Sequence, residues 1–353
     1  MSVRQKLGHL SHVLVILTGA IICGFIAWWI RFPLPWMLGA LVFSASVRLM
    51  DFDIRVPVQT RQLGQLLVAS SVGLSFTPDA LRVMGTLAGP MVLAAVLTII
   101  LSFFVARALV RMTRVGSDMA ILATLPMGPV ESAILARKHG VAQGPVIFSQ
   151  TLRIVLLVVL IPPLIVMVDG SISDPVAVLR GADWDLTGAL IVFAFGFAGA
   201  MVMKGLRLSN PFFLGPLAGA ALAAVVGLPV SAYPYIVLAG AQIFLGIWLG
   251  AAIDRALFRN ARSFLLGLLV AALILIALCI LMGLGLAWMT GQPWQTMILS
   301  AAPGSVTEMA LTAKILQDGL AVVTAFHIVR IFIIMPFSGR IVAVSLRFMR
   351  PAS

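Results

Sequence analysis

The chain has 353 residues, of which 61% are hydrophobic and 10% are charged, and its formal net charge is +12. This composition excludes an ordinary soluble domain, and recurring apolar runs of about 17–25 residues predict helices that cross a bilayer. The basic residues gather at the ends of these runs, as they do in membrane proteins, so the positive charge does not indicate direct binding of nucleic acid. We therefore expect an all-α polytopic membrane protein.

The first half of the chain contains six apolar segments that we predict to be helical. The first begins after a short basic stretch and is longer than the apolar core of a signal peptide, so we expect an uncleaved helix there. The six segments cover residues 10–30, 34–50, 62–76, 87–110, 118–137 and 141–168.

The fifth segment is interrupted near its middle. Its stretch LATLPMGPVESA contains Pro126, Gly128 and Pro129. Proline removes a backbone donor and clashes with the preceding turn, so a continuous helix is not expected over 118–137. A break at membrane depth requires that the freed backbone groups face protein or a wet cavity.

A second copy of this pattern occurs 177 residues later, where a second broken segment at 295–315 contains Pro303 and Gly304. The chain has two glutamates, and they too are 177 residues apart. With a spacing of 176, RFPLPWMLGAL also matches RLSNPFFLGPL. The pairs at a spacing of 177 include Glu131 with Glu308, Arg153 with Arg330, Gln150 with His327, Gln65 with Gln242, and Gly73 with Gly250. We predict two homologous repeats at 1–170 and 184–353, joined by an acidic external linker at 171–183.

Two topologies follow from the broken segments. If they re-enter, each repeat crosses the membrane five times, which gives about 10 crossings, inverted repeats and two cytoplasmic termini. If they cross, there are twelve crossings and the repeats are parallel. Re-entry is favoured because it places the basic loops inside and the acidic linker outside a bacterial inner membrane.

The two glutamates are candidate substrate-binding or coupling residues. An ionisable side chain within a span costs roughly 2.5–3.5 kcal/mol, so it usually faces a cavity or a partner. Glu131 and Glu308 each follow a break, at the positive end of a predicted half-helix that stabilises a carboxylate. The alternative is that each glutamate only caps its half-helix.

Five further polar residues are candidates for the same site. The forks of Arg153 and Arg330 suit a substrate carboxylate, or they form structural pairs with the glutamates. One turn earlier, His327 is either a proton carrier or, like Gln150, a neutral hydrogen-bonding group. A further pair, Gln65 and Gln242, either lines the same cavity or bonds neighbouring helices to each other.

The duplicated motifs RFPLPWMLGAL, LPMGPVESA and APGSVTEMA resemble the AbrB family of membrane proteins over residues 10–345. The resemblance implies a doubled membrane module, and members carry labels such as regulator or ammonia monooxygenase. An oxygenase needs a cofactor or a cluster of metal ligands. The chain has four histidines, none of them spaced as a ligand pair within a span, so we expect no enzyme activity, no cofactor and no metal site.

Inverted repeats with broken helices are typical of secondary transporters. We therefore expect transport of a small anionic solute, held between the two broken segments and coupled to protons or Na⁺. The alternative is a membrane regulator or sensor that affects gene expression indirectly, through a ligand or a partner. Either function is compatible with a homo-oligomer.

Overall fold

The computed structural model describes residues 3–30, 32, 34–52, 54, 57–169, 183–208, 210–252, 262–316 and 319–349. Its side chains are described except at residues 3–12, 79, 129–131, 169, 262, 335 and 349. The predicted acidic linker therefore lies almost entirely outside the described residues.

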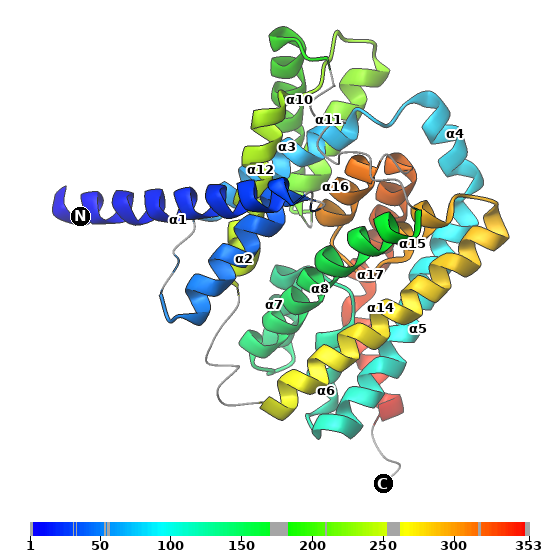
Figure 1. Ribbon diagram of the computed structural model, residues 1–353. Helices are drawn as coiled ribbons and strands as arrows, with labels where there is room; N and C mark the ends of the chain where they lie inside the picture. The colour runs from blue at the N-terminus through cyan, green and yellow to red at the C-terminus, as the bar shows by residue number, and fades with distance from the viewer. Residues whose placement is uncertain are drawn as a thin grey trace. The chain divides into compact units, whose positions relative to one another are not determined.

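All regular structure in these ranges is helical, so the predicted all-α class is confirmed (Figure 1). In chain order the helices are α1 (Val3–Trp29), α2 (Pro35–Leu49), α3 (Val58–Gly73), α4 (Pro78–Thr86), α5 (Ala88–Thr113), α6 (Ser117–Thr124), α7 (Pro129–Lys138), α8 (Gln143–Asp169), α10 (Leu186–Gly205), α11 (Pro211–Val225), α12 (Tyr235–Ala251), α14 (Arg262–Thr290), α15 (Trp294–Ala301), α16 (Val306–Leu316) and α17 (Leu320–Met349). The short helix α4 was not among the predicted elements.

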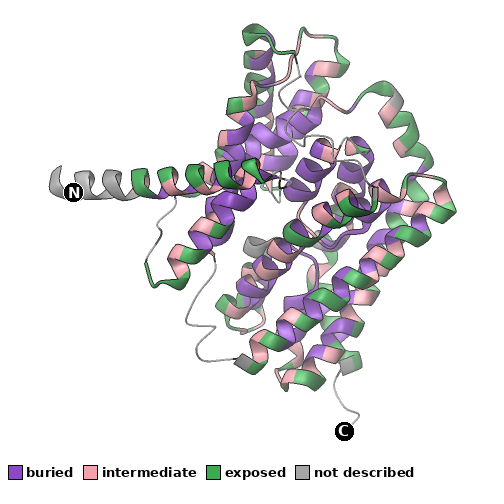
Figure 2. Cartoon of the chain, viewed as in Figure 1, coloured by how far each residue is buried: buried purple, intermediate pink, exposed green. Residues whose placement is uncertain are grey.

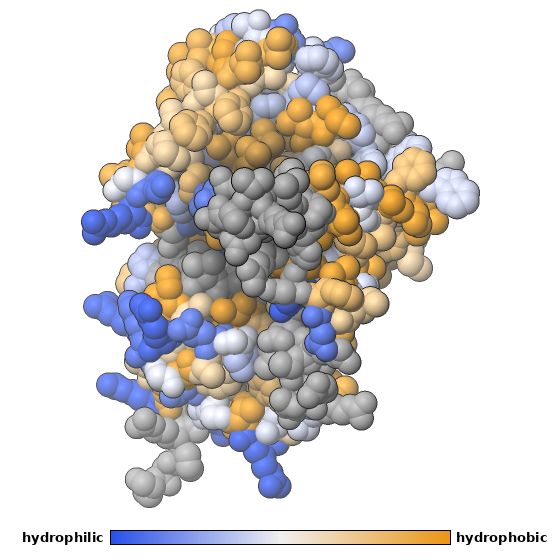
Figure 3. All heavy atoms as spheres, turned by 90° about the vertical axis from the view of Figure 1, so that its left-hand side faces the viewer, coloured by the Kyte–Doolittle hydropathy of each residue, from blue (hydrophilic) through white to orange (hydrophobic). Residues whose placement is uncertain are grey.

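Several of the described helices can cross a membrane. Four are long and apolar enough by themselves, namely α5, α8, α10 and α14. Helix α17 is a fifth if its two parts, which meet at a 64° bend before Pro336, count as one span. Many of their apolar side chains are exposed, for example Leu281 at 64% and Trp288 at 91% on α14. Exposed stretches recur along α14 in Figure 2, and hydrophobic residues cover large parts of the face that Figure 3 shows. Such exposed apolar surface fits contact with lipid.

The chain divides into two compact units. Unit 1 consists of Met1–Thr77 and Val166–Arg255, and unit 2 consists of Pro78–Ile165 and Ala256–Ser353. Each unit thus takes one segment from each half of the chain, so the compact units do not coincide with the predicted sequence repeats.

Unit 1 is built on close contacts between helices at glycines. A Cβ atom on Gly73 of α3 would lie 2.5 Å from the carbonyl oxygen of Leu217 on α11. A Cβ atom on Gly250 of α12 would lie 2.4 Å from the carbonyl oxygen of Leu41 on α2. Both contacts bring two backbones together where a side chain does not fit.

Two further glycine contacts of unit 1, one from each half of the chain, occupy corresponding positions. A Cβ on Gly39 would lie 2.5 Å from the backbone of Cys23 on α1, and a Cβ on Gly215 would lie 2.4 Å from the backbone of Gly199 on α10. Gly215 and Gly199 lie 176 positions after Gly39 and Cys23, respectively. The first and second halves of the chain therefore supply matching contacts to unit 1.

The contact at Gly73 predicts a large difference between two glycine substitutions. Gly73→Ala will lower the free energy of unfolding by about 1–3 kcal/mol, because the new methyl group overlaps the α11 backbone. Gly85→Ala on α4 is the matched control: its Cβ would meet nothing within 4 Å, and alanine favours a helix by roughly 0.5–1 kcal/mol. Denaturation of the purified protein will check both, and equal stability of the two variants would contradict the contact.

Unit 2 is framed by two long antiparallel helices, α5 and α14. A Cβ on Gly267, near the start of α14, would lie 2.1 Å from the side chain of Thr113 at the end of α5. At the opposite end, Leu87 and Met91 at the start of α5 share an apolar cluster with Leu286 near the end of α14. Besides α4, the short helices α6, α7, α15 and α16 belong to this unit.

Candidate functional site

Unit 2 contains both predicted breaks. Helix α6 ends at Thr124 and α7 begins at Pro129, which takes the first helical position that proline favours. Pro126 and Gly128 lie in the intervening turn. In the second copy, Pro303 and Gly304 lie between the end of α15 and the start of α16.

A buried arginine on α8 binds the first break. Arg153, 2% exposed, donates from Nη1 to the carbonyl oxygen of Thr124 at 3.2 Å and from Nη2 to that of Met127 at 3.5 Å. Its Nη2 also donates to Oε1 of Gln150. The amide nitrogen of Gln150 in turn donates to the carbonyl oxygens of Leu122 and Leu125, at 2.8 and 3.0 Å.

The second break has the same arrangement around α17. Arg330, 5% exposed, donates from Nη1 to the carbonyl oxygen of Ala302 at 2.6 Å and from Nη2 to that of Gly304 at 2.7 Å. Its Nη2 also bonds Nδ1 of His327, whose Nε2 lies 3.0 Å from the carbonyl oxygen of Leu299. His327 therefore takes the place that Gln150 has at the first break.

The two guanidinium groups satisfy carbonyls that the ends of α6 and α15 leave without a helical partner. A cation at a helix C-terminus also opposes the negative end of the helix dipole. Within the described part of the chain, the hydrogen bonds of Arg153 and Arg330 go to these carbonyls and to residue 150 or 327, rather than to a glutamate. Direct binding of a solute by either arginine stays a prediction.

The hydrogen bonds also give the direction of each broken segment. Ser149 bonds the carbonyl of Ala123, and Arg153, one turn later, bonds Thr124 and Met127, so α8 runs in the same direction as α6. Helix α7 must therefore return to the end at which α6 began.

The second broken segment also returns to its starting end. A Cβ on Gly319, just before α17, would lie 2.4 Å from Thr296 near the start of α15. Further along, Arg330 reaches the carbonyls after the end of α15, so α17 also runs parallel to α15. Helix α16 thus returns to the end at which α15 began.

The two hairpins, α6–α7 and α15–α16, start at opposite ends of unit 2. Helix α6 follows the end of α5 and α15 follows the end of α14, and α5 and α14 are antiparallel. The turns of the two hairpins come close: a Cβ on Gly304, in the second break, would lie 3.1 Å from the side chain of Leu157, which is one turn after Arg153 on α8. Two broken helices thus meet inside one compact unit.

The glutamates lie at the starts of the second half-helices, as predicted. Glu308 is in the first turn of α16 and is 8% exposed, beside the fully buried Thr307. Glu131 occupies the corresponding place in α7, and its side chain lies outside the described residues. The capping role and the coupling role of the two carboxylates both remain compatible with this position.

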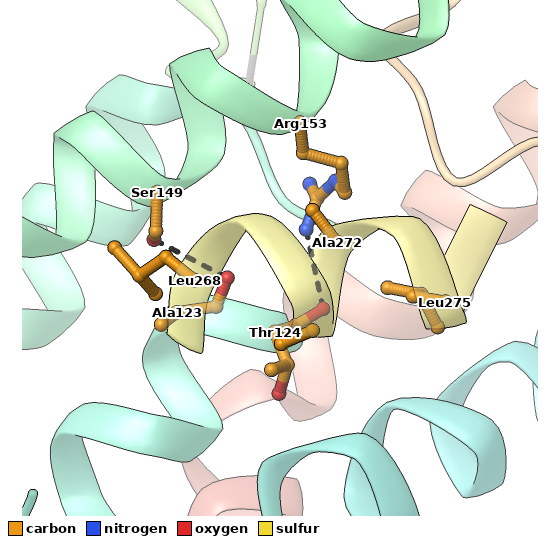
Figure 4. Close-up of a pocket in the computed structure, with 8 residues that line it drawn as sticks. Ala123, Thr124, Ser149, Arg153, Leu268, Ala272 and Leu275 are labelled. Atoms are coloured by element: carbon orange, nitrogen blue, oxygen red, sulfur yellow. Dashed lines mark hydrogen bonds between the residues drawn. The ribbon is translucent and has the colours of Figure 1, made fainter. Parts of the chain in front are cut away.

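A small cavity lies beside the first break (Figure 4). Its volume of about 10 Å³ is enough for roughly one water molecule. Ser149 and Arg153 line it from α8, Thr124 lines it from the end of α6, and α14 lines it with residues such as Ala272 (Figure 4). The place that corresponds to Ser149 is taken in the second half by Phe326, which packs in an apolar cluster. Ser149 was not among the predicted site residues. The sequence could have pointed to it, because a serine stands there and a phenylalanine stands 177 positions later.

The hydrogen bonds of His327 determine its protonation. A guanidinium only donates, so Nδ1 of His327 accepts from Arg330, and Nε2 carries the proton that is donated to Leu299. A second proton on the ring would place two buried cations side by side. The structure thus has His327 as a neutral hydrogen-bonding group.

This tautomer predicts that glutamine can replace the histidine. His327→Gln will keep the free energy of unfolding within about 1 kcal/mol of the native value, since Gln150 makes the same bonds at the first break. His327→Leu will lower it by about 1–3 kcal/mol, because the Leu299 carbonyl and the Arg330 donor lose their partner. Equal losses in the two variants, measured by denaturation, would show that the imidazole has a role that an amide does not fill.

The two remaining candidates lie in unit 1. Gln65 on α3 and Gln242 on α12 are both buried, at 6% and 1% exposure. No three His, Cys, Asp or Glu side chains among the described residues gather in a way that could hold a metal ion.

Comparison with known proteins gives one matching family and two relatives. A family model described as "Transition state regulatory protein AbrB" matches residues 36–345. "Uncharacterized protein YhjN" of Bacillus subtilis (strain 168) is 26% identical in an alignment of 340 positions that covers 88% of this chain and 87% of that protein. "Putative regulator AbrB" of Escherichia coli (strain K12) is 23% identical in an alignment of 331 positions that covers 92% of each chain.

Proposed function

We propose that this chain, which belongs to the AbrB family, is a secondary transporter of a small solute that binds where the two broken helices meet. One observation carries this proposal: two helical hairpins, each of which returns to the end at which it began, start at opposite ends of unit 2, and their turns come close inside it. Broken helices that meet at the middle of a membrane are where secondary transporters of inverted-repeat design bind their solutes.

The proposed topology has ten crossings and two inverted repeats. The crossing helices would be α1, α2, α3, α5 and α8 in the first repeat and α10, α11, α12, α14 and α17 in the second. The matching glycine contacts of unit 1 and the matching arginine contacts of unit 2 support a duplication. The opposite directions of α5 and α14 support inversion, since these two helices correspond.

The solute that best suits the turns carries a small anionic group. The N-termini of α7 and α16 present free N–H groups and the positive end of a helix dipole. The Nη atoms of Arg153 and Arg330 are bonded to backbone carbonyls. The two guanidinium groups therefore contribute positive potential and do not bind the solute directly in this proposal. In this proposal Glu308 and Glu131 carry the coupled proton, and their charge changes as the solute enters.

The test begins with thermal stabilisation of the purified protein by a panel of carboxylates, inorganic anions, amino acids and amines. A ligand that binds only the folded state raises the melting temperature by mass action. A carboxylate or inorganic anion that does so will be taken up into proteoliposomes, and Glu308→Gln will abolish the pH dependence of uptake. Stabilisation by amines alone would contradict the anionic solute.

The name of the Escherichia coli relative favours a second candidate, a regulator. In that case the same site would bind its ligand without translocating it, and the signal would pass through a partner protein. Ligand binding that remains with no uptake into proteoliposomes would support this candidate over transport.

A further inference from the structure

Gln242 is a buried amide that the packing of unit 1 leaves without partners. Its side chain is 1% exposed, and across the described ranges neither its Oε1 nor its Nε2 has a hydrogen-bond partner. A polar group buried in this way costs stability, and a native structure retains few such groups unless they have a use.

Helices α3 and α12 cross at this position. A Cβ on Gly64 would lie 3.0 Å from the carbonyl oxygen of Ala241, and the guanidinium of Arg61 lies 3.9 Å over the ring of Trp248. The earlier residue of α3, Arg61, contacts the later residue of α12, and Gly64 contacts the earlier one. The two helices are therefore antiparallel. Residues 65 and 242, which are 177 positions apart, directly follow the two residues in contact.

Gln150 provides an internal contrast. It is the same residue type, equally buried at 0% exposure, and both of its amide atoms are bonded: Nε2 to two carbonyls, and Oε1 to Arg153. Gln150 thus serves the fold, whereas Gln242 offers a donor and an acceptor that the fold does not use.

We infer that Gln242, together with Gln65, forms a binding site in unit 1 for a small uncharged group that both donates and accepts hydrogen bonds, such as a hydroxyl or an amide. The buried polar residues described in unit 1 are all uncharged, among them Ser44, Ser70 and Ser71, so this site suits a neutral group. The inference goes beyond the proposed transport function and does not rest on it.

The first test compares Gln242→Leu with Gln150→Leu in ligand-free detergent solution. Leucine has nearly the volume of glutamine and no polar atoms. Gln242→Leu will raise the melting temperature by roughly 2–6 °C, because an unpaired amide is removed, whereas Gln150→Leu will lower it because two carbonyls and a guanidinium lose their partner. A lower melting temperature in both variants would show that Gln242 is already satisfied, by a helix or by permanent water, and would overturn the inference.

The second test asks whether small water-borne molecules reach the site. Single cysteines replace Gln242 or Ile247 of the same helix in a protein whose Cys23 and Cys279 have become alanine; Ile247 is 3% exposed and belongs to an apolar cluster. A methanethiosulfonate ethylammonium reagent will modify the cysteine of Gln242→Cys at least about tenfold faster than that of Ile247→Cys. Equal rates would overturn the inference. Neither test requires transport, so the transport proposal can fail without affecting them.

Discussion

Arg330→Leu will lower the free energy of unfolding by about 3–5 kcal/mol, the largest stability loss that we expect from one substitution in this chain. The guanidinium bonds the carbonyls of Ala302 and Gly304 and the ring of His327, and all three lose their partner in the variant. Breaking a buried charged contact by removing one side typically costs this much, because the other side stays buried and unsatisfied.

Two further variants show what the guanidinium does. Arg330→Lys will recover only part of the loss, since an ammonium is a point charge that cannot span two carbonyls as a planar fork does. Arg340→Leu, on the exposed side of the same helix, is the control and will change stability by less than about 0.5 kcal/mol. If Arg330→Leu unfolds like this control and loses only its response to ligand, the arginine binds solute instead of holding the break.

The direction of the hairpins predicts an all-or-none result in cysteine labelling. Met112 near the end of α5 and Ala142 just before α8 flank the first hairpin, and both are exposed. Because α7 returns to the end at which α6 began, Met112→Cys and Ala142→Cys will be labelled from the same side of the membrane by an impermeant reagent. The arginines at the end of α5 indicate that this side is the cytoplasm.

The second hairpin supplies the opposite result. Gln292→Cys, between α14 and α15, will be labelled only from the other side, because α14 runs antiparallel to α5. The parent protein without its two native cysteines shows the background. Labelling of Met112→Cys and Ala142→Cys from different sides would mean that the broken segment crosses, which would contradict the inverted repeats.

Hydropathy and proline placement predict most of the helices of the first half of the chain, because a bilayer demands long apolar runs and proline interrupts them. The predicted broken segments at 118–137 and 295–315 agree within about two residues with α6–α7 and α15–α16. Helix α4 was not predicted, because its nine residues are amphipathic and form a helix too short to cross a membrane.

The partners of the site residues could not be predicted, because they depend on how distant segments pack. The spacing of 177 residues identifies Arg153 and Arg330 as equivalent, but both a glutamate and a substrate are reasonable partners for a buried arginine. The structure instead pairs them with backbone carbonyls that the breaks set free. Likewise, only packing distinguishes Gln150, with both amide atoms bonded, from the unbonded Gln242.

The hydrogen bonds that hold each break have a consequence for synthesis of the chain. They join residues only 25–29 positions apart, whereas side-chain bonds in unit 1 link Trp36 to Tyr235 and Ser70 to Tyr233, 199 and 163 positions apart. Chains emerge from the ribosome N-terminus first, and closing a short loop costs less entropy than closing a long one. The first hairpin can therefore close as soon as α8 is made, whereas α3 and α2 lack their partners α11 and α12 until the second half of the chain is synthesised.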